Sequence, residues 1–313
     1  MKKIIKYFQV YNFQVFKIIF RNFLFYLHKK INPKGSLLIN IYNFKMLISL
    51  KYDGISKVLY MLKKRELDHK WMIDNELSPG SVVLDIGANI GYYLIMVAKK
   101  IGSLGKIYAI EPDPRNIELL KKNIKLNNLD DIVYLEEGAI SNKDEIAELK
   151  LSAKTNINTF EPKKNQYYDN SIKVQKYDFG NYLKNKKRFD MVRMDIEGHE
   201  INIFDSLIRF SKNFENHLPK KIIFETHCDV YKKQKEYVRK ILSEIFELGY
   251  EIKYFSSPNE PVEVLKIRSY YPFKIINDHL FRRGIYKEIN HQDFIDIITE
   301  AGGIRTVMLE LKK

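Results

Sequence analysis

The sequence predicts an α/β protein whose mostly parallel sheet carries helices on both faces. From residue 79 onward, short apolar runs alternate with longer segments of helical periodicity, as is typical of strands joined by crossover helices. The first of these runs ends in an acidic residue and a turn with two glycines, residues 85–91. The 313 residues, 45% of them hydrophobic, suffice for one large core or two small ones.

Residues 1–35 are predicted to form a basic, amphipathic helical arm that ends near Pro33 and Gly35. Residues 1–52 contain ten basic side chains and no acidic one, so most of the formal net charge of +14 lies there. At about 100° per residue the arm has two faces. Lys3, Lys6, Gln14, Lys17, Arg21 and His28 fall on one face, and Ile5, Phe8, Phe16, Ile19, Phe23 and Tyr26 gather on the other.

The arm is not expected to span a membrane. Its uncharged stretch between Lys6 and Lys17 holds ten residues, whereas a spanning helix needs roughly 20. We expect it to lie on an anionic membrane surface, or else to dock on the protein's own body or on a second subunit. The lone Cys228 excludes an intramolecular disulfide, so the default location is cytoplasmic, with peripheral binding at the inner membrane face.

Residues 36–78 are predicted to form a helical lead-in. It begins with an extended piece at 46–52, turns at 53–54, and continues as one or two helices up to residue 77. No internal repeat or low-complexity linker separates it from the residues after 78. We therefore expect this segment to lead directly into the main domain.

The main domain is predicted to span residues 79–313. Its strands are expected at 82–84, 106–110, 132–135, 190–194, 222–224, 251–255 and 306–311, and its helices near 91–101, 114–126, 201–210 and 232–248. A hairpin-like stretch at 146–151 and 172–176 interrupts the alternation. Residues 256–304 are expected to form an insertion rich in aromatic and cationic groups, which either covers an acceptor site or is a surface excursion.

The turn after the first strand predicts a nucleotide-like cofactor. Gly87 and Gly91 allow a sharp turn and a close backbone approach, and the following helix presents free N–H groups. A dinucleotide site needs the pattern G-x-G-x-x-G. Here the spacing is Gly87-x-x-x-Gly91, with Asp85 ahead and Asn89 between, which favours S-adenosylmethionine over NAD.

Two further strand ends support this cofactor. Glu111 ends the second strand, where a carboxylate can accept both hydroxyls of an adenosine ribose. The third strand ends in Glu136-Glu137-Gly138-Ala139, a place that can flank an adenine. A glycine at one strand end is usually only a turn, but these features occur in order along the chain and together predict a site.

Three motifs resemble the FkbM family of S-adenosylmethionine-dependent methyltransferases. They are Leu84-Asp85-Ile86-Gly87-Ala88-Asn89-Ile90-Gly91, Met194-Asp195-Ile196-Glu197-Gly198-His199-Glu200 and Phe224-Glu225-Thr226-His227, and the likeness covers roughly residues 78–255. The resemblance implies a Rossmann-like, seven-stranded methyltransferase sheet. It also implies methyl transfer to an oxygen, commonly a sugar or glycan hydroxyl.

The resemblance also implies functional residues. The family's cofactor loop falls on Asp85, Gly87, Ala88, Asn89 and Gly91, its ribose acid on Glu111, and its fourth-strand signature on Asp195, Glu197 and Gly198. The chain departs from the family at Arg193, where members usually carry a lysine. A cation is kept at this position.

Four polar residues are candidates for the proton acceptor that a sugar hydroxyl needs. Asp195 and Glu197 follow the fourth strand, and Glu225 and His227 follow the fifth, so all four are expected at the rim where open α/β sheets bind ligands. Carboxylates at strand ends bind magnesium in some methyltransferases, but no convincing metal-ligand set is predicted. His199 and Glu200 are expected to start the next helix.

The expected partner is a glycan or lipid-linked sugar acceptor. The alternatives are an RNA methyltransferase and a non-catalytic, membrane-associated binding module. Nucleic acid is disfavoured because the chain has no Asn/Asp-Pro-Pro-Tyr/Phe loop and its basic excess lies in an arm with helical apolar spacing. The binding module is disfavoured because the cofactor and strand-end acids are all present.

Overall fold

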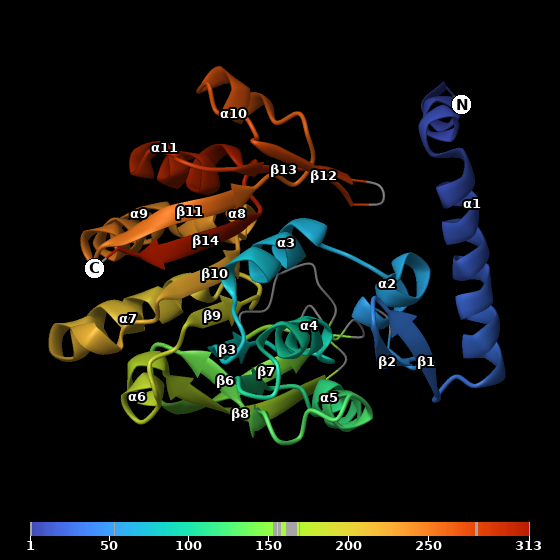
Figure 1. Ribbon diagram of the computed structural model, residues 1–313, viewed down its shortest axis with the longest axis horizontal. Helices are drawn as coiled ribbons and strands as arrows, with labels where there is room; N and C mark the ends of the chain where they lie inside the picture. Colours follow the sequence, from blue (N-terminus) through green and yellow to red (C-terminus); the bar gives the residue numbers. More distant parts are fainter. Residues whose placement is uncertain are drawn as a thin grey trace.

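The computed structural model describes residues 2–52, 54–152, 155, 158–160, 168, 170–278 and 281–312, with the backbone alone for residues 2–15 and 278. A large twisted sheet forms the centre, and helices cover both of its faces (Figure 1). This confirms the predicted α/β class.

The described residues place nine strands in the central sheet, where seven were expected. Across the sheet the strands are β12 (Lys274–Asp278), β13 (Phe281–Tyr286), β11 (Tyr250–Ser256), β14 (Thr306–Leu311), β10 (Lys221–Glu225), β9 (Met191–Met194), β3 (Val82–Ile86), β4 (Lys106–Glu111) and β5 (Val133–Glu137). The five from β10 to β5 are parallel to their neighbours, and β14 pairs antiparallel with both β10 and β11.

The two additional strands come from residues 256–304, which the sequence predicted as an insertion. β13 pairs antiparallel with β11 through Phe255 and Tyr286, and β12 pairs with β13. The segment therefore extends the sheet at its far edge. It also contains α10 (Glu263–Ile267), α11 (His291–Asp296) and a π-helical turn, Ile297–Ala301.

Each face of the sheet has its own core because side chains alternate along a strand. Leu84 of β3 packs in one core with α6, α7, α9 and α11, whereas Val83 packs in the other with α2, α3, α4 and α5. The helices are α2 (Ile55–Leu62), α3 (Leu67–Glu76), α4 (Tyr92–Ile101), α5 (Pro114–Leu126), α6 (Phe179–Lys184), α7 (Glu200–Phe214), α8 (Cys228–Tyr231) and α9 (Lys235–Glu247).

A smaller sheet stands beside the parallel strands. It consists of β6 (Ala139–Ser141), β8 (Asn170–Asp178) and β7 (Glu145–Leu151), in that order. β7 and β8 form the predicted antiparallel hairpin, with Leu149 opposite Ile172. β6 continues from β5 after Gly138, so the small sheet lies next to the carboxyl ends of the large one.

The N-terminal arm forms one helix, α1 (Lys2–Ile31), as predicted. It stands at one side of the molecule, with α2 and a hairpin between it and the main sheet (Figure 1). Phe25 is fully buried and its ring centroid lies 5.4 Å from that of Tyr60, while Arg21 donates to the carbonyl of Met61 at 3.0 Å. No helix in the described part of the chain is both long and apolar enough to cross a bilayer.

The prediction of a helical lead-in was wrong for its first part. Residues 36–49 form a hairpin of β1 (Ser36–Ile41) and β2 (Phe44–Ser49) before α2 and α3. Only the second strand was predicted, because Ser36 and Asn40 are weak strand formers that interrupt the apolar residues of β1.

Candidate active site

A cavity of about 600 Å³ opens at the carboxyl ends of β3, β4 and β9. The predicted residues Gly87, Asn89, Glu111, Gly138 and Ala139 line it, together with the loop that follows β9. Apolar side chains of Ile86, Ile110, Ile140, Leu149 and Phe160 complete the wall. A cavity that combines apolar walls with polar side chains suits an adenosine.

Gly87 is required where the cofactor loop meets the loop after β9. Its φ is +79°, and a Cβ atom there would lie 2.6 Å from the carbonyl oxygen of Asp195. Gly91, at φ +94°, begins α4, and a Cβ atom would lie 2.8 Å from Leu120 Cδ1. Gly91 does not line the cavity, so its contribution is to the close approach of α4 and α5.

Glu111 is held firmly at the end of β4. Its Oε2 accepts from the N–H of Asn89 at 2.8 Å, and its Oε1 accepts from Asn116 at 3.0 Å and from the N–H of Asp113 at 3.1 Å. Burial raises the pKa of Glu111 to about 7, against the lowering effect of these hydrogen bonds. The carboxyl thus faces the cavity with its orientation set and its charge sensitive to pH near neutrality.

Gly138 and Ala139 border the cavity between β5 and β6. At φ +157°, Gly138 brings its backbone so close that a Cβ atom would lie 2.7 Å from Tyr177 and 2.9 Å from the carbonyl of Gln175. His199 lines the cavity from the other side, and its Nε2 lies 2.9 Å from Ser141 Oγ. Burial lowers the pKa of His199 to about 4, so the ring is neutral.

The structure places Asp85 behind the site. It is fully buried and lines no described cavity, although it was predicted to bind the cofactor. Its Oδ1 instead accepts from Arg193 Nη1 at 3.0 Å. The other end of the same guanidinium donates to Asp195 Oδ2 at 2.9 Å. Arg193 therefore links the ends of β3 and β9.

Asp195 and Glu197 lie where the first cavity meets a second one of about 250 Å³. Gly87 and Asn89 also border both, and the second cavity adds Ala88 together with Arg65, Tyr92, Tyr93, Glu225 and His227. The four candidate proton acceptors thus converge on one place, as predicted. The two cavities provide space for two molecules that meet between them.

Three of these four candidates have shifted pKa values. Burial alone would lower the pKa of His227, but the carboxylates of Glu200, Asp195 and Glu225 raise it to about 10. Burial would raise the pKa of Asp195, but Arg193 and His227 hold it below its usual value. Burial raises the pKa of Glu225 in spite of Arg305, whose Nη2 lies 3.0 Å from the carboxylate. At neutral pH, His227 is therefore an imidazolium that cannot accept a proton.

Glu200 is more than the first residue of α7. It is fully buried, and its Oε1 accepts from the N–H of Ile196 at 3.1 Å while its Oε2 accepts from Tyr231 at 3.0 Å. It reaches back over the loop in which Glu197, at φ +59°, and Gly198, at φ +102°, adopt left-handed conformations. Glu200 therefore fixes the loop that presents Asp195 and Glu197.

No sequence motif marks several residues of the site, among them Arg65 and Arg305. Arg65 precedes α3 and Arg305 precedes β14, far along the chain from the strand-end motifs. Both pair with the buried Glu66, which also accepts from the hydroxyl of Tyr93. Only the fold brings Arg65 to the wall of the second cavity and Arg305 to Glu225.

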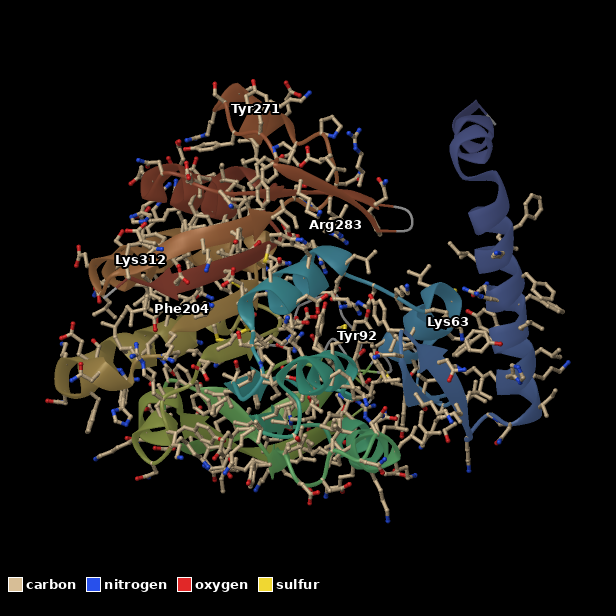
Figure 2. The ribbon with its side chains drawn as sticks, in the orientation of Figure 1. Lys63, Tyr92, Phe204, Tyr271, Arg283 and Lys312 are labelled. Atoms are coloured by element: carbon tan, nitrogen blue, oxygen red, sulfur yellow. The ribbon has the colours of Figure 1, made fainter. Side chains whose placement is uncertain are left out.

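The described residues of the segment 256–304 line neither cavity. The expectation that this segment covers the acceptor site therefore finds no support in the described residues. The alternative, a surface excursion, does not describe it either, because β12 and β13 extend the central sheet and Phe294 packs in the main core. Tyr271 and Arg283 lie on this distal part of the molecule (Figure 2). Arg283 is buried and pairs with Asp68 at 3.3 Å, which is a structural role.

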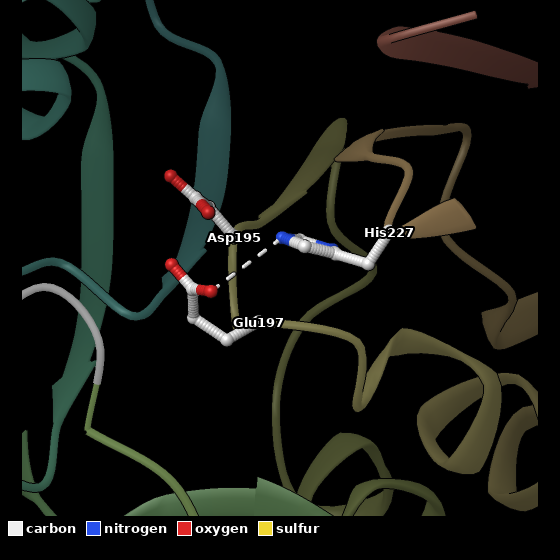
Figure 3. A group of neighbouring side chains, drawn as sticks. All are labelled: Asp195, Glu197 and His227. Atoms are coloured by element: carbon white, nitrogen blue, oxygen red, sulfur yellow. Dashed lines mark ion pairs between the residues drawn. The ribbon is translucent and has the colours of Figure 1, made fainter. Parts of the chain in front are cut away.

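Three of the site residues could hold a metal ion, although no ligand set was predicted. The ligand atoms of Asp195, Glu197 and His227 all lie within 4.8 Å of one another. Figure 3 shows the imidazole pointing toward the Glu197 carboxylate, with the Asp195 carboxylate beside it. The distance from His227 Nε2 to Glu197 Oε2 is 4.0 Å.

Short parts of this chain are similar in sequence to known proteins. The ribosomal protein L11 methyltransferase of Carboxydothermus hydrogenoformans is 34% identical over 61 residues, which is 20% of this chain and 19% of that protein. The chain spans less than a third of the curated relatives it matches. Such short matches cover a segment of each relative.

Two solved structures are similar to this chain over most of its length, at low sequence identity. Precorrin-6y C5,15-methyltransferase from Geobacter metallireducens has a TM-score of 0.39 at 14% identity and covers 84% of this chain and 95% of its own. A SAM-dependent O-methyltransferase from Thermotoga maritima has a TM-score of 0.39 at 13% identity, with 90% and 80% covered.

The family assignment comes from a longer match. The model of the methyltransferase FkbM domain matches residues 85–252, more than half of the chain, and this range contains all twelve predicted site residues. The family, the enzyme class and the cofactor that three motifs predicted are thereby confirmed. The chain belongs to the FkbM methyltransferase family, whose cofactor is S-adenosylmethionine.

Proposed function

We propose that this protein is an O-methyltransferase that transfers the methyl group of S-adenosylmethionine to a sugar hydroxyl of a glycan or glycolipid. The observation that carries the proposal is the meeting of two cavities at Asp195 and Glu197. One cavity has the size and lining for the cofactor. The other is smaller and polar, and three candidate acids and His227 border it.

The first cavity is where the cofactor is proposed to bind. Glu111 would accept the ribose hydroxyls, and the apolar wall beside Gly138 would contact the adenine. Asn89 orients Glu111 through its backbone N–H. When bound, S-adenosylmethionine supplies an electrophilic methyl group on a sulfonium.

The second cavity is proposed to hold the acceptor. In-line displacement requires the acceptor oxygen to stand on the far side of the methyl group, so the two molecules must approach from separate cavities. Asp195 and Glu197 lie at the junction and would hydrogen-bond the hydroxyl. The Arg65 guanidinium provides N–H donors along the wall. The hydroxyls of Tyr92 and Tyr93 donate to the Arg65 carbonyl and to Glu66, so these two side chains would contribute mainly their rings to the wall.

Glu225 is the proposed proton acceptor. His227 is already protonated, and the carboxylate of Asp195 is committed to Arg193. Burial raises the pKa of Glu225, which makes its carboxylate a stronger base than an ordinary one. Glu225 borders the second cavity and not the first, so it lies on the acceptor side.

The location of the acceptor is proposed from α1. The exposed large apolar side chains of this helix include Ile19, Phe20, Phe23, Leu27 and Ile31. They lie on the side away from the buried Phe25, and no acidic residue accompanies the ten basic ones of residues 1–52. An apolar stripe within a basic segment complements an anionic lipid surface. We therefore propose that the acceptor is a lipid-linked or surface-destined glycan at a membrane face.

The test uses purified protein, S-adenosylmethionine with a labelled methyl group, and a cell extract separated into lipid-linked, free glycan, RNA and protein fractions. We expect label in a lipid-linked or glycan fraction, and release of the label as a methyl ether after acid hydrolysis. Label that ribonuclease removes would overturn the sugar proposal in favour of RNA methylation. The variant Glu111→Ala provides the blank, since it removes the proposed ribose contact.

A further inference from the structure

We propose that Asp195, Glu197 and His227 bind one divalent cation at the junction of the two cavities, with manganese preferred over magnesium. The proposal deepens the proposed function, on which it rests for the role of the cation. It goes beyond the sequence prediction, which assigned no metal ligand.

The three side chains come together from two loops. Asp195 and Glu197 follow β9, His227 follows β10, and their ligand atoms lie within 4.8 Å of one another. Octahedral coordination at about 2.1 Å places neighbouring ligand atoms about 3 Å apart. Rotation of the Glu197 side chain, which is 30% exposed, suffices to close the 4.0 Å distance to His227.

Two of the three proposed ligands, Asp195 and His227, also have an outer contact that orients them. Arg193 donates to Asp195 Oδ2 at 2.9 Å, which leaves Oδ1 for the cation. His227 Nδ1 lies 3.4 Å from Glu200 Oε1, which leaves Nε2 on the side of Glu197. The imidazolium would release its Nε2 proton to solvent when the cation binds, because only the neutral ring can be a ligand. Metal-binding histidines commonly turn their second nitrogen toward a carboxylate in this way. Glu200 is fully buried and is held by Tyr231, so the imidazole has a fixed support.

The donor set indicates which cation fits. Two carboxylates and one imidazole suit Mn²⁺ better than Mg²⁺, which prefers oxygen ligands alone. Three protein ligands leave about three coordination positions. Both cavities border Asp195 and Glu197, so these positions face the proposed acceptor.

The cation would select acceptors with two neighbouring oxygens. Two adjacent hydroxyls of a sugar can occupy two of the open positions, which fixes the ring and lowers the pKa of the reacting hydroxyl. The O–H bond then breaks and its proton passes to Glu225. The oxygen forms its bond to the methyl carbon as the carbon–sulfur bond breaks, and the sulfonium leaves as a neutral thioether.

The alternative is a cluster that is neutralised by protein charges alone. In that case the protonated His227 and Arg193 balance the nearby carboxylates, and no cation binds. The two explanations differ in a binding measurement that involves neither the cofactor nor the acceptor.

The experiment titrates Mn²⁺ into the full-length, chelator-treated protein and follows free Mn²⁺ by electron paramagnetic resonance. We expect one Mn²⁺ per chain with a dissociation constant below 1 mM, and a tenfold or greater loss in Glu197→Gln and in His227→Gln. His217→Gln, which changes an exposed histidine, is the matched control and keeps the affinity of the unmodified protein. Binding weaker than 1 mM, or unchanged binding in both ligand variants, overturns the proposal.

Two further readouts keep the conclusions separate. Thermal melting and binding of S-adenosylhomocysteine establish that the two variants are folded, so that a loss of Mn²⁺ is a loss of ligands. Methyl transfer to a glycan that survives chelation would refute the cation and leave the proposed function intact. Stoichiometric Mn²⁺ binding without any glycan methylation would refute the proposed function and leave the site.

Discussion

The carboxyl of Glu111 makes cofactor binding depend on pH. Its pKa of about 7 lies well above the value of 4.5 for an unburied glutamate. Between these values the folded protein keeps a proton that the unfolded chain has lost, so this group lowers stability as pH rises through the window. The ribose hydroxyls need the ionised form as their acceptor. Cofactor affinity is therefore expected to change in the opposite direction and to rise with pH.

The prediction is measured by calorimetric titration of S-adenosylhomocysteine. Lowering the pH from 8 to 6 should weaken binding about tenfold, because about one carboxyl in ten is ionised one unit below its pKa. Glu111→Gln should bind more weakly at pH 8 and show no such dependence. An unmodified protein whose affinity is flat from pH 6 to 8 would contradict the assignment of the ribose to Glu111.

Replacing Glu225 by Gln should affect the chemical step. We expect kcat to fall by roughly 10²–10⁴, the usual contribution of a general base, with little change in KM. The arginine left behind keeps a partner, since Arg305 also pairs with Glu66 at 2.7 Å, so the fold should hold. Steady-state kinetics test this, with the exposed Asp229→Asn as the control. A Glu225→Gln enzyme with normal kcat would exclude this base.

Some residues of the site were predictable and others were not, for a physical reason. Gly87, Asn89, Glu111 and Gly138 stand at strand ends that can be found from local apolar runs, and they do line the cavity. The protonation of His227 depends on Glu225, two residues away, and on Asp195 and Glu200, which lie about 30 residues earlier in the chain and meet His227 only in the fold. No local pattern carries that information.

At the scale of elements, the turn between β3 and α4 depends on its glycine. Gly87→Ala adds a Cβ atom 2.6 Å from the Asp195 carbonyl at a φ of +79°. Backbone strain and crowding together should cost about 2–5 kcal/mol of unfolding free energy. The same change should abolish cofactor binding, because the loop after β3 must move away from the loop after β9 to make room for the added Cβ atom.

Gly102 offers a matched control for this prediction. It also has a positive φ, +68°, but a Cβ atom there meets nothing within 4 Å. Gly102→Ala should therefore cost only the strain, about 1–2 kcal/mol. Urea unfolding of the two variants separates crowding from conformation. An equal loss of unfolding free energy in the two variants would show that crowding against Asp195 does not affect stability.

Strands with two buried faces were predicted well, and edge strands were not. β3, β9 and β10 are short, mostly apolar and largely buried runs, in spite of the charged Asp85 and Arg193 within two of them. β12 has exposed residues and β1 is buried only on alternate residues toward its end, so their place in a sheet depends on a partner. β13 joins the sheet by pairing with β11, which lies 25 residues earlier in the chain.

At the scale of the whole molecule, the position of α1 predicts membrane binding. The exposed fractions of Phe20 and Phe23 are 60% and 61%. The double variant Phe20→Ser with Phe23→Ser should reduce cosedimentation with phosphatidylglycerol vesicles several-fold, since each aromatic ring contributes buried apolar area. Leu104→Ser changes an apolar residue that is 83% exposed and lies between α4 and β4, outside α1, and this variant should bind like the unmodified protein.

Vesicle composition and salt sharpen this test. Binding should require anionic lipid and weaken as salt is raised, because the basic side chains of residues 1–52 supply part of the attraction. Equal sedimentation of the double variant would exclude the apolar stripe as the contact. Concentration-dependent dimerisation that the double variant loses, without any vesicle binding, would assign the stripe to a second copy of the chain.

The guanidinium of Arg193 sets a condition for engineering this scaffold. It joins Asp85 of β3 to Asp195 after β9, so a cofactor loop and an acceptor loop share one cation. A chimera that takes only one of these loops from a relative would leave a buried carboxylate or a buried guanidinium without its counterpart. Loop grafting in this enzyme should therefore exchange both strand ends and the arginine as a single unit.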